Sequence, residues 1–92
     1  MIESFAHKGL KRLYDDDDGR KLPPDMLERI GILLAALDEA NSIEDMNRPS
    51  FRLHKLTGKL KEFWSITVRA NWRIIFRFDD GTATDIDFVD YH

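Results

Sequence analysis

Apolar residues recur at steps of three and four positions in two stretches of the first half of the chain. Residues 7–14 predict a short helix, and residues 25–40 predict a longer one that Pro23-Pro24 precedes. The apolar stripe of the longer helix, typical of packing against a core, consists of Leu27, Ile30, Leu34 and Leu37, widened by Met26 and Leu33. Asp15 to Asp18 should end the first helix in a solvated loop, because adjacent carboxylates repel one another and oppose the helix dipole.

After Ser50 the pattern changes to the two-residue alternation of β-strands. The expected strands begin at Phe51, Trp64, Trp72 and Asp85, and turn signals at 57–59, 70–71 and 79–81 separate them. Trp64 and Trp72 fall on inward-facing positions and are expected in the core. Residues 2–6 alternate weakly and are expected to form a short N-terminal strand. The pattern predicts one α+β domain over residues 1–92, with this short strand and two helices packed on an antiparallel β-meander.

Composition excludes several classes of site. The chain has no cysteine, which excludes disulfides, zinc–thiolate centres and a catalytic thiol. It has no glycine-rich phosphate loop, and its histidines, at positions 7, 54 and 92, lack metal-ligand spacing. We therefore expect neither a metal nor a cofactor. The N-terminus lacks the pattern of a signal peptide, and the longest apolar run, residues 32–37, is too short to cross a bilayer. We expect a cytoplasmic protein without membrane association.

Charge is distributed unevenly along the chain, although the formal net charge is −3. Residues 48–77 contain eight basic side chains and one acidic side chain, Glu62, which is a net charge of +7. The remainder contains six basic and sixteen acidic side chains, a net charge of −10. A basic segment on an acidic body favours a polyanionic partner such as nucleic acid. The alternative is that the excess charges pair with one another in the fold.

The sequence ends in three residues that can exchange protons, Asp90-Tyr91-His92. Because imidazole in general titrates near neutrality, His92 can act as an acid or a base, and Asp90 can orient it. The carboxylate of the chain end should favour the imidazolium form. The alternative for these residues is a frayed tail. The preceding apolar residues Ile86 and Phe88 favour a tail that is held near the sheet.

Other candidate groups lie on two of the expected strands, where a cluster around the sheet is geometrically possible. His54 shares a strand face with Arg52, and Arg73 shares one with Arg77. Together with the final tripeptide they suit RNA cleavage by the RNA's own 2′-hydroxyl: a base removes the hydroxyl proton, cations stabilise the phosphorane and an acid protonates the leaving 5′-oxygen. The competing interpretation is that Arg73 and Arg77 pair across strands with Asp85 and Asp87.

The chain resembles the HigB toxins, also called plasmid maintenance system killer proteins, of the RelE/ParE superfamily. The resemblance lies in Trp64-Ser65-Ile66-Thr67-Val68-Arg69-Ala70-Asn71-Trp72-Arg73-Ile74 and in the final Asp90-Tyr91-His92. It extends to the opening residues 1–10, and to Leu53-His54-Lys55-Leu56 with Gly58. It therefore covers essentially the whole chain and implies a compact RelE-like domain.

The resemblance implies a type II toxin that cleaves messenger RNA in the decoding site of a translating ribosome. It implies a HigA-like helix-turn-helix antitoxin as partner, with operator DNA contacted only through that antitoxin, and the 70S ribosome with its mRNA as target. The implied catalytic residues are His54, Asp90, Tyr91 and His92, with Arg73 as a phosphate contact. Further expected phosphate contacts are Lys55, Lys59, Arg52 and Arg69.

One position departs from the family. Where some members carry a lysine three residues after the histidine, this chain has Thr57, which cannot stabilise phosphate charge as an ammonium does. Lys55 and Lys59 are the candidates to compensate. Two alternatives to a nuclease therefore stay open: a non-enzymatic ParE-like toxin that binds DNA gyrase, and a ribosome- or RNA-binding module that has lost catalysis. The final Asp-Tyr-His argues against the first, and Thr57 is the one hint for the second.

Overall fold

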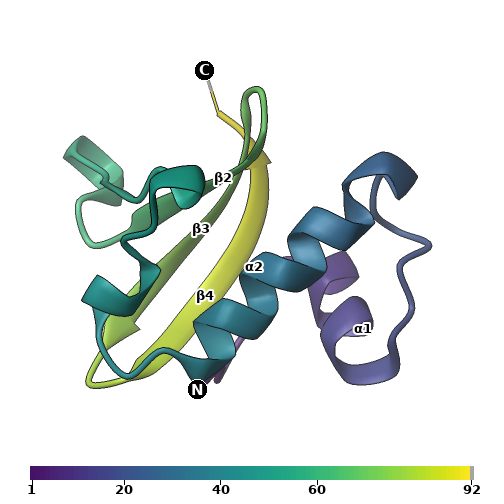
Figure 1. Cartoon of the computed structure of the whole chain (residues 1–92), viewed down its shortest axis with the longest axis horizontal. Coiled ribbons are helices and arrows are strands. Elements are labelled where there is room, and N and C mark those ends of the chain that lie inside the picture. Colours follow the sequence, from purple (N-terminus) through teal and green to yellow (C-terminus); the bar gives the residue numbers. More distant parts are fainter. Residues whose placement is uncertain (92) are drawn as a thin grey trace.

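Two helices and a four-stranded antiparallel sheet make up the computed structural model, which describes residues 1–91. The helices are α1 (Lys8–Asp16) and α2 (Leu27–Glu39), and α2 crosses one face of the sheet (Figure 1). The strands are β1 (His54–Lys55), β2 (Trp64–Arg69), β3 (Trp72–Asp79) and β4 (Thr82–Asp90), in the order β1-β2-β3-β4. Four short 3-10 turns are η1 (Pro24–Met26), η2 (Ile43–Met46), η3 (Pro49–Phe51) and η4 (Gly58–Leu60). The predicted α+β meander is confirmed.

Helix α1 is fixed at both ends by side-chain and backbone capping. The Nδ1 atom of His7 accepts a hydrogen bond from the backbone N–H of Leu10, at 3.2 Å, and so satisfies one of the free donors of the first turn. Asp17 ends the helix in the left-handed conformation, with φ of 54°. The predicted acidic loop therefore starts later than expected, because Asp15 and Asp16 still belong to the helix.

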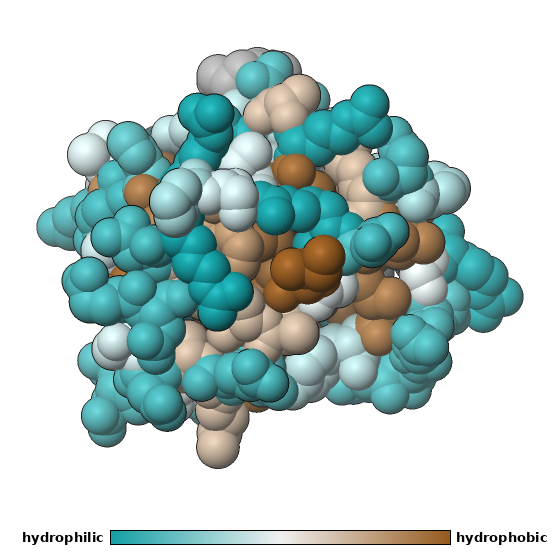
Figure 2. Space-filling view, viewed as in Figure 1, coloured by the Kyte–Doolittle hydropathy of each residue, from teal (hydrophilic) through white to brown (hydrophobic). Residues whose placement is uncertain are grey.

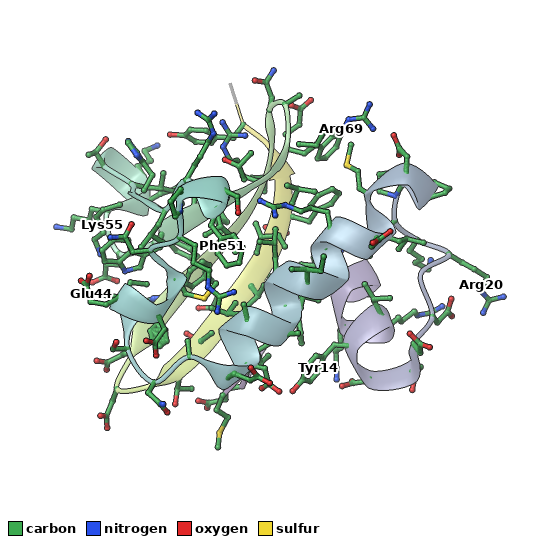
Figure 3. The ribbon with its side chains drawn as sticks, in the orientation of Figure 1. Tyr14, Arg20, Glu44, Phe51, Lys55 and Arg69 are labelled. Carbon is green, nitrogen blue, oxygen red and sulfur yellow. The ribbon has the colours of Figure 1, made fainter. Side chains whose placement is uncertain are left out.

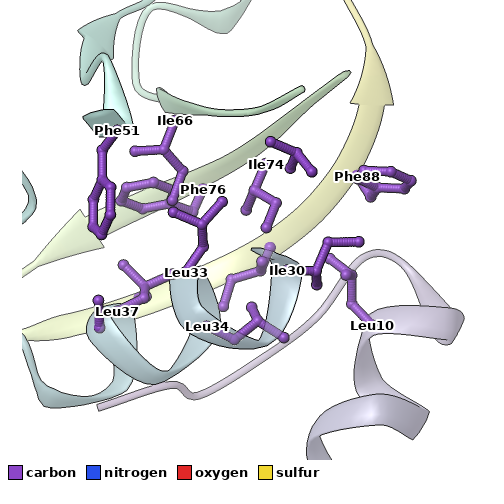
Figure 4. Packing of buried hydrophobic residues seen from close by; sticks show 14 of the residues in the cluster. Leu10, Ile30, Leu33, Leu34, Leu37, Phe51, Ile66, Ile74, Phe76 and Phe88 are labelled. Carbon is purple, nitrogen blue, oxygen red and sulfur yellow. The ribbon is translucent and has the colours of Figure 1, made fainter. Parts of the chain in front are cut away.

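The core lies between α2 and the sheet (Figure 4). The buried stripe of α2 packs against inward-facing residues of the strands; these are Ile30, Leu33, Leu34 and Leu37 from the helix and Ile66, Ile74, Phe76 and Ile86 from the sheet. Trp64 and Trp72 are half-buried and pack against this core, as expected from their positions. The face of the molecule that carries α2 is largely hydrophilic, with some apolar side chains near its centre (Figure 2). On α2, Ile32 is 50% exposed.

Two tight turns connect the three long strands. Asp79 pairs with Thr82 across a two-residue turn in which Asp80 and Gly81 have φ of 50° and 78°. Positive φ at both positions is the geometry that Asp-Gly favours, so the predicted hairpin is confirmed. Arg69 pairs with Trp72 across the second turn, in which Ala70 has φ of 51°.

The predicted bounds of two strands are wrong. Residues 2–6 form isolated parallel bridges to β4, Ile2 with Ala83 and Phe5 with Ile86, rather than a regular strand. Phe51 ends the turn η3, which Pro49 opens, and Arg52 has φ of 52°, so the alternation expected from Phe51 onward is interrupted. The strand that includes His54 is only two residues long.

Within residues 1–91, none of the helices has the length and apolar character needed to span a membrane.

Candidate functional site

A cleft of about 500 Å³ opens on the face of the sheet that α2 leaves uncovered. Cross-strand partners share a face, and the pairs His54–Ser65 and Thr67–Arg73 alternate with the core residues of β2 and β3. The described residues that line the cleft are Arg52, Leu53, His54, Lys55, Leu56, Thr57, Ser65, Thr67, Arg73 and Tyr91. The fold thus joins the segment around β1 with the start of β3 and with the residue that follows β4.

The described lining of this cleft carries cations and no carboxylate. Arg52, Lys55 and Arg73 are basic, and His54 and Tyr91 can exchange protons. This local excess of positive charge contrasts with the formal net charge of −3 for the chain. Such a cleft attracts a polyanion. Five of the nine predicted site residues, namely Arg52, His54, Lys55, Arg73 and Tyr91, therefore lie together.

Tyr91 is held in place by its backbone. Its N–H donates a hydrogen bond to the carbonyl oxygen of Asn71, at 2.8 Å, in the turn between β2 and β3. The side chain is 45% exposed and borders the cleft. The frayed-tail alternative therefore does not apply to Tyr91. His92, the fourth predicted catalytic residue, lies outside the described residues.

Asp90 is placed differently from Tyr91. It is the last residue of β4 and pairs with Trp72, and it is not among the residues that line the cleft. Because side chains alternate along a strand, Asp90 leaves β4 on the side of Phe88 and Trp72, opposite to Tyr91. The sequence placed both in one site, whereas the fold brings only Tyr91 to the cleft.

Arg73 and Arg77 have different partners although they lie on the same strand. The Nη1 of Arg73 donates to the carbonyl oxygens of Ala70 and, at 3.4 Å, of Trp72. Arg77 forms ion pairs with Glu62 and, at 3.6 Å, with Asp85, and lies over the ring of Phe63. No ion pair among residues 1–91 includes Arg73. The charge-pairing interpretation is therefore confirmed for Arg77 with Asp85, and no pair of this kind is found for Arg73.

Lys55 stands at the border of two clefts. It lines the first cleft and also a second one of about 550 Å³, which contains Arg77, Glu62 and Asp79. Its Nζ lies 4.9 Å from the centre of the Trp64 ring, the residue opposite it on β2. Strand alternation sends the Lys55 side chain to the side of β1 opposite His54.

The remaining predicted cations lie elsewhere. Arg69 forms an ion pair with Asp25 in η1, and Lys59 belongs to η4; neither lines the first cleft. Figure 3 shows Arg69 far from Lys55. Among the lining residues that the sequence did not assign to the site are the polar Ser65 and Thr67, whose outward-facing positions on β2 were the available signal. Among the described residues, no group of three or more His, Asp or Glu side chains is placed to hold a metal ion.

Comparisons with known proteins agree with this architecture. A family model described as the RelE-like toxin of the type II toxin–antitoxin system HigB matches residues 3–92. The chain is 46% identical over 92 residues to Endoribonuclease HigB of Proteus vulgaris, and 100% of both chains is covered. It is 34% identical over 94 residues to Toxin HigB-1 of Vibrio cholerae serotype O1, which covers 100% of this chain and 98% of that protein.

Solved structures show the same fold at lower sequence identity. The heterotetrameric YoeB–YefM toxin–antitoxin complex of Staphylococcus aureus matches with a TM-score of 0.63 and 20% identity, over 100% of this chain and 95% of that one. The YoeB dimer of the same organism matches with a TM-score of 0.60 and 20% identity, over 99% and 94%.

Proposed function

This chain belongs to the HigB-like family of RelE-like toxins from type II toxin–antitoxin systems, and we propose that its first cleft is the site at which it cleaves messenger RNA. The chain is a type II toxin with endoribonuclease activity. The observation that carries the proposal for the cleft is its lining among residues 1–91: three cations, a histidine and a tyrosine without a carboxylate. RNA brings one negative charge per nucleotide to such a surface.

The proposed reaction needs only groups that this chain and the RNA contain. A base removes the proton of a ribose 2′-hydroxyl, and the oxygen attacks the adjacent phosphorus. The bond from phosphorus to the 5′-oxygen then breaks, an acid protonates that oxygen, and a 2′,3′-cyclic phosphate and a 5′-hydroxyl are left. Cations stabilise the charge that develops on the phosphorane.

We assign the roles as follows. His92 is the acid or base. Asp90 is its orienting partner, a role exerted only through His92 because Asp90 itself does not line the cleft. Tyr91 positions the RNA or shares in proton transfer, and His54 and Arg73 stabilise the developing charge. Lys55 is the lysine assigned to the same task, because it lines the cleft and Lys59 does not; its Nζ lies over the Trp64 ring and must turn towards the cleft to act. Thr57 also borders the cleft, but its neutral hydroxyl supplies no charge.

Ribosome dependence is part of the proposal. A site of few groups on an open sheet face has little means of bending an RNA strand into the geometry for in-line attack, whereas a ribosome that holds the strand supplies this. The 70S ribosome with its mRNA is then the target, in the cytoplasm, and the free protein should cleave naked RNA poorly.

An antitoxin is the second partner. The YoeB toxin of Staphylococcus aureus was solved in complex with YefM, and membership of a toxin–antitoxin family assigns this chain an antitoxin as well. We propose a HigA-like helix-turn-helix protein, through which alone the toxin reaches operator DNA.

Primer extension on a message translated in a reconstituted system tests the proposal. The active chain should give discrete cuts that disappear when translation is blocked, and His54→Asn and deletion of His92 should both suppress them at least tenfold. His7→Asn is the matched control, because it removes a histidine that does not line the cleft and keeps a capping side chain. Intact message with arrested DNA replication would instead support the gyrase-binding alternative. Cuts that persist in both site variants would remove the assignment of the cleft.

A further inference from the structure

The turn between β2 and β3 makes hydrogen bonds with two of the residues that border the first cleft. Three consecutive carbonyl groups, those of Ala70, Asn71 and Trp72, accept these bonds. The donors are the guanidinium of Arg73 and the backbone N–H of Tyr91. Tyr91 is 20 positions from Asn71 in sequence, so a local turn connects the start of β3 with the end of β4.

The turn holds one end of the Arg73 side chain and leaves its phosphate-binding edge outside these bonds. Both hydrogen bonds from Arg73 use Nη1. Arginine binds phosphate in bidentate fashion through a pair of parallel N–H groups, and the Nε–Nη2 edge provides such a pair. A guanidinium that is hydrogen-bonded through Nη1 loses less side-chain entropy when phosphate binds, because its orientation is already set.

The turn also determines where Tyr91 lies. The pairing of β3 with β4 ends at Asp90. The backbone hydrogen bond from Tyr91 to Asn71 then fixes the position of the next residue of the chain. Because Arg73 and Tyr91 are both attached to this turn, the position of one relative to the other depends on the direction of its carbonyl groups.

The turn has a conformation that its sequence does not favour. Ala70 has φ of 51°, in the left-handed region that alanine avoids and glycine or asparagine adopts more readily. A two-residue hairpin turn with Asn-Gly would satisfy the connection with less strain, but it would point the carbonyl groups in other directions.

We infer that the Ala70–Trp72 turn is a positioning segment of the nuclease site, which sets the Arg73 guanidinium and Tyr91 in register through its three carbonyl groups. The inference rests on the proposed function of the cleft. None of the three turn residues lines the cleft, so the turn acts on the reaction only through Arg73 and Tyr91.

The first test needs no RNA. The double substitution Ala70→Asn with Asn71→Gly exchanges the turn while keeping its length, and Asn71→Ala controls for loss of the Asn71 side chain. In the parent chain the Arg73 Nη1 hydrogens, which donate to the turn carbonyl groups, should give resolved, slowly exchanging nuclear magnetic resonance signals at low temperature. The double variant should lose this protection while its unfolding midpoint stays the same or rises, because the Asn-Gly turn is less strained. An unchanged Arg73 signal in the double variant would overturn the inference, whatever the chain does to RNA.

The second test is a double-mutant cycle on cleavage of translated message. The turn exchange should lower the cleavage rate about tenfold, since small misplacements of reacting groups have effects of this order. Arg73→Ala should also lower the cleavage rate less in the exchanged-turn variant than in the parent chain, by a factor at least about three times smaller. The reason is that the two changes remove the same interaction. Arg77→Ala, the matched control on the same strand, should combine with the turn exchange multiplicatively. Multiplicative behaviour of Arg73→Ala as well would overturn the inference. Absence of cleavage by the parent chain would instead refute the proposed function, and the resonance test would still decide the role of the turn.

Discussion

Replacement of Arg73 by alanine is the most direct probe of the proposed RNA contact, and Arg77→Ala is its internal control. Both substitutions remove one positive charge from the exposed side of β3. Arg73 lines the first cleft and is held by backbone carbonyl groups. Arg77 lines the second cleft and is compensated by Glu62 and Asp85. A difference between the two variants therefore measures the location of the charge rather than its amount.

The size of the effect follows from counterion release. One phosphate contact on a single strand contributes a slope of about −0.7 to log K against log salt. If Arg73 makes one such contact, its loss weakens binding about eightfold at 50 mM salt and about threefold at 200 mM salt, by the same relation. Arg77→Ala should leave both the affinity and the slope nearly unchanged, because its charge is already balanced locally.

Fluorescence anisotropy with a short oligonucleotide that lacks reactive 2′-hydroxyl groups measures this without cleavage. Titrations at four salt concentrations give the slope for the parent chain and for each variant. Equal losses in slope for the two variants would mean that RNA responds to the overall charge of the sheet face. An unchanged affinity and salt slope for Arg73→Ala would mean that Arg73 contacts no phosphate, and the mechanism would lose its main cation.

Three further predictions concern stability. His7→Ala should lower the free energy of unfolding by about 1 kcal/mol in urea denaturation, and His7→Asn should restore most of it, because the side chain caps α1. Hydrogen bonds from the Arg20 side chain and backbone lower the pKa of Asp18 to about 2, so the stability from Asp18 is complete above about pH 4 and is lost as the pH falls towards 2; in Arg20→Ala, a titration by nuclear magnetic resonance should find this pKa raised towards 3.8. Arg52→Gly should be more stable than Arg52→Ala by about 1 kcal/mol, since φ is 52° there, and both should bind RNA more weakly than the parent chain.

Much of the fold was predictable because its signals are local. The stripe of α2 and the Asp80-Gly81 turn depend on residues that are neighbours in sequence, and both are confirmed. The strand predicted for the segment before β1 was wrong for the opposite reason. Phe51 to His54 alternate as a strand would, but the left-handed conformation of Arg52 has no signature in the identity of that residue, because arginine has no preference for it.

The site was predictable as far as strand parity determines it. Parity placed His54 and Arg73 on the uncovered face, where the cleft lies. Asp90 and Tyr91 leave β4 on opposite sides, and of these two only Tyr91 lines the cleft. The position of Tyr91 depends on its bond to Asn71, a contact between distant residues that no local pattern announces.

The contrast between Arg73 and Arg77 shows what determines the chemistry of such a surface. Strand parity makes the two arginines equivalent, and each had carboxylates within expected reach. The fold brings Glu62, from the segment after η4, and Asp85, from β4, to Arg77. It brings carbonyl groups of a turn to Arg73 instead. A carbonyl group orients a guanidinium without neutralising it, whereas a carboxylate does both. The described lining of the cleft is therefore positive in an acidic protein because the tertiary structure places the side-chain carboxylates of residues 1–91 elsewhere, which a count of cations along the sequence does not reveal.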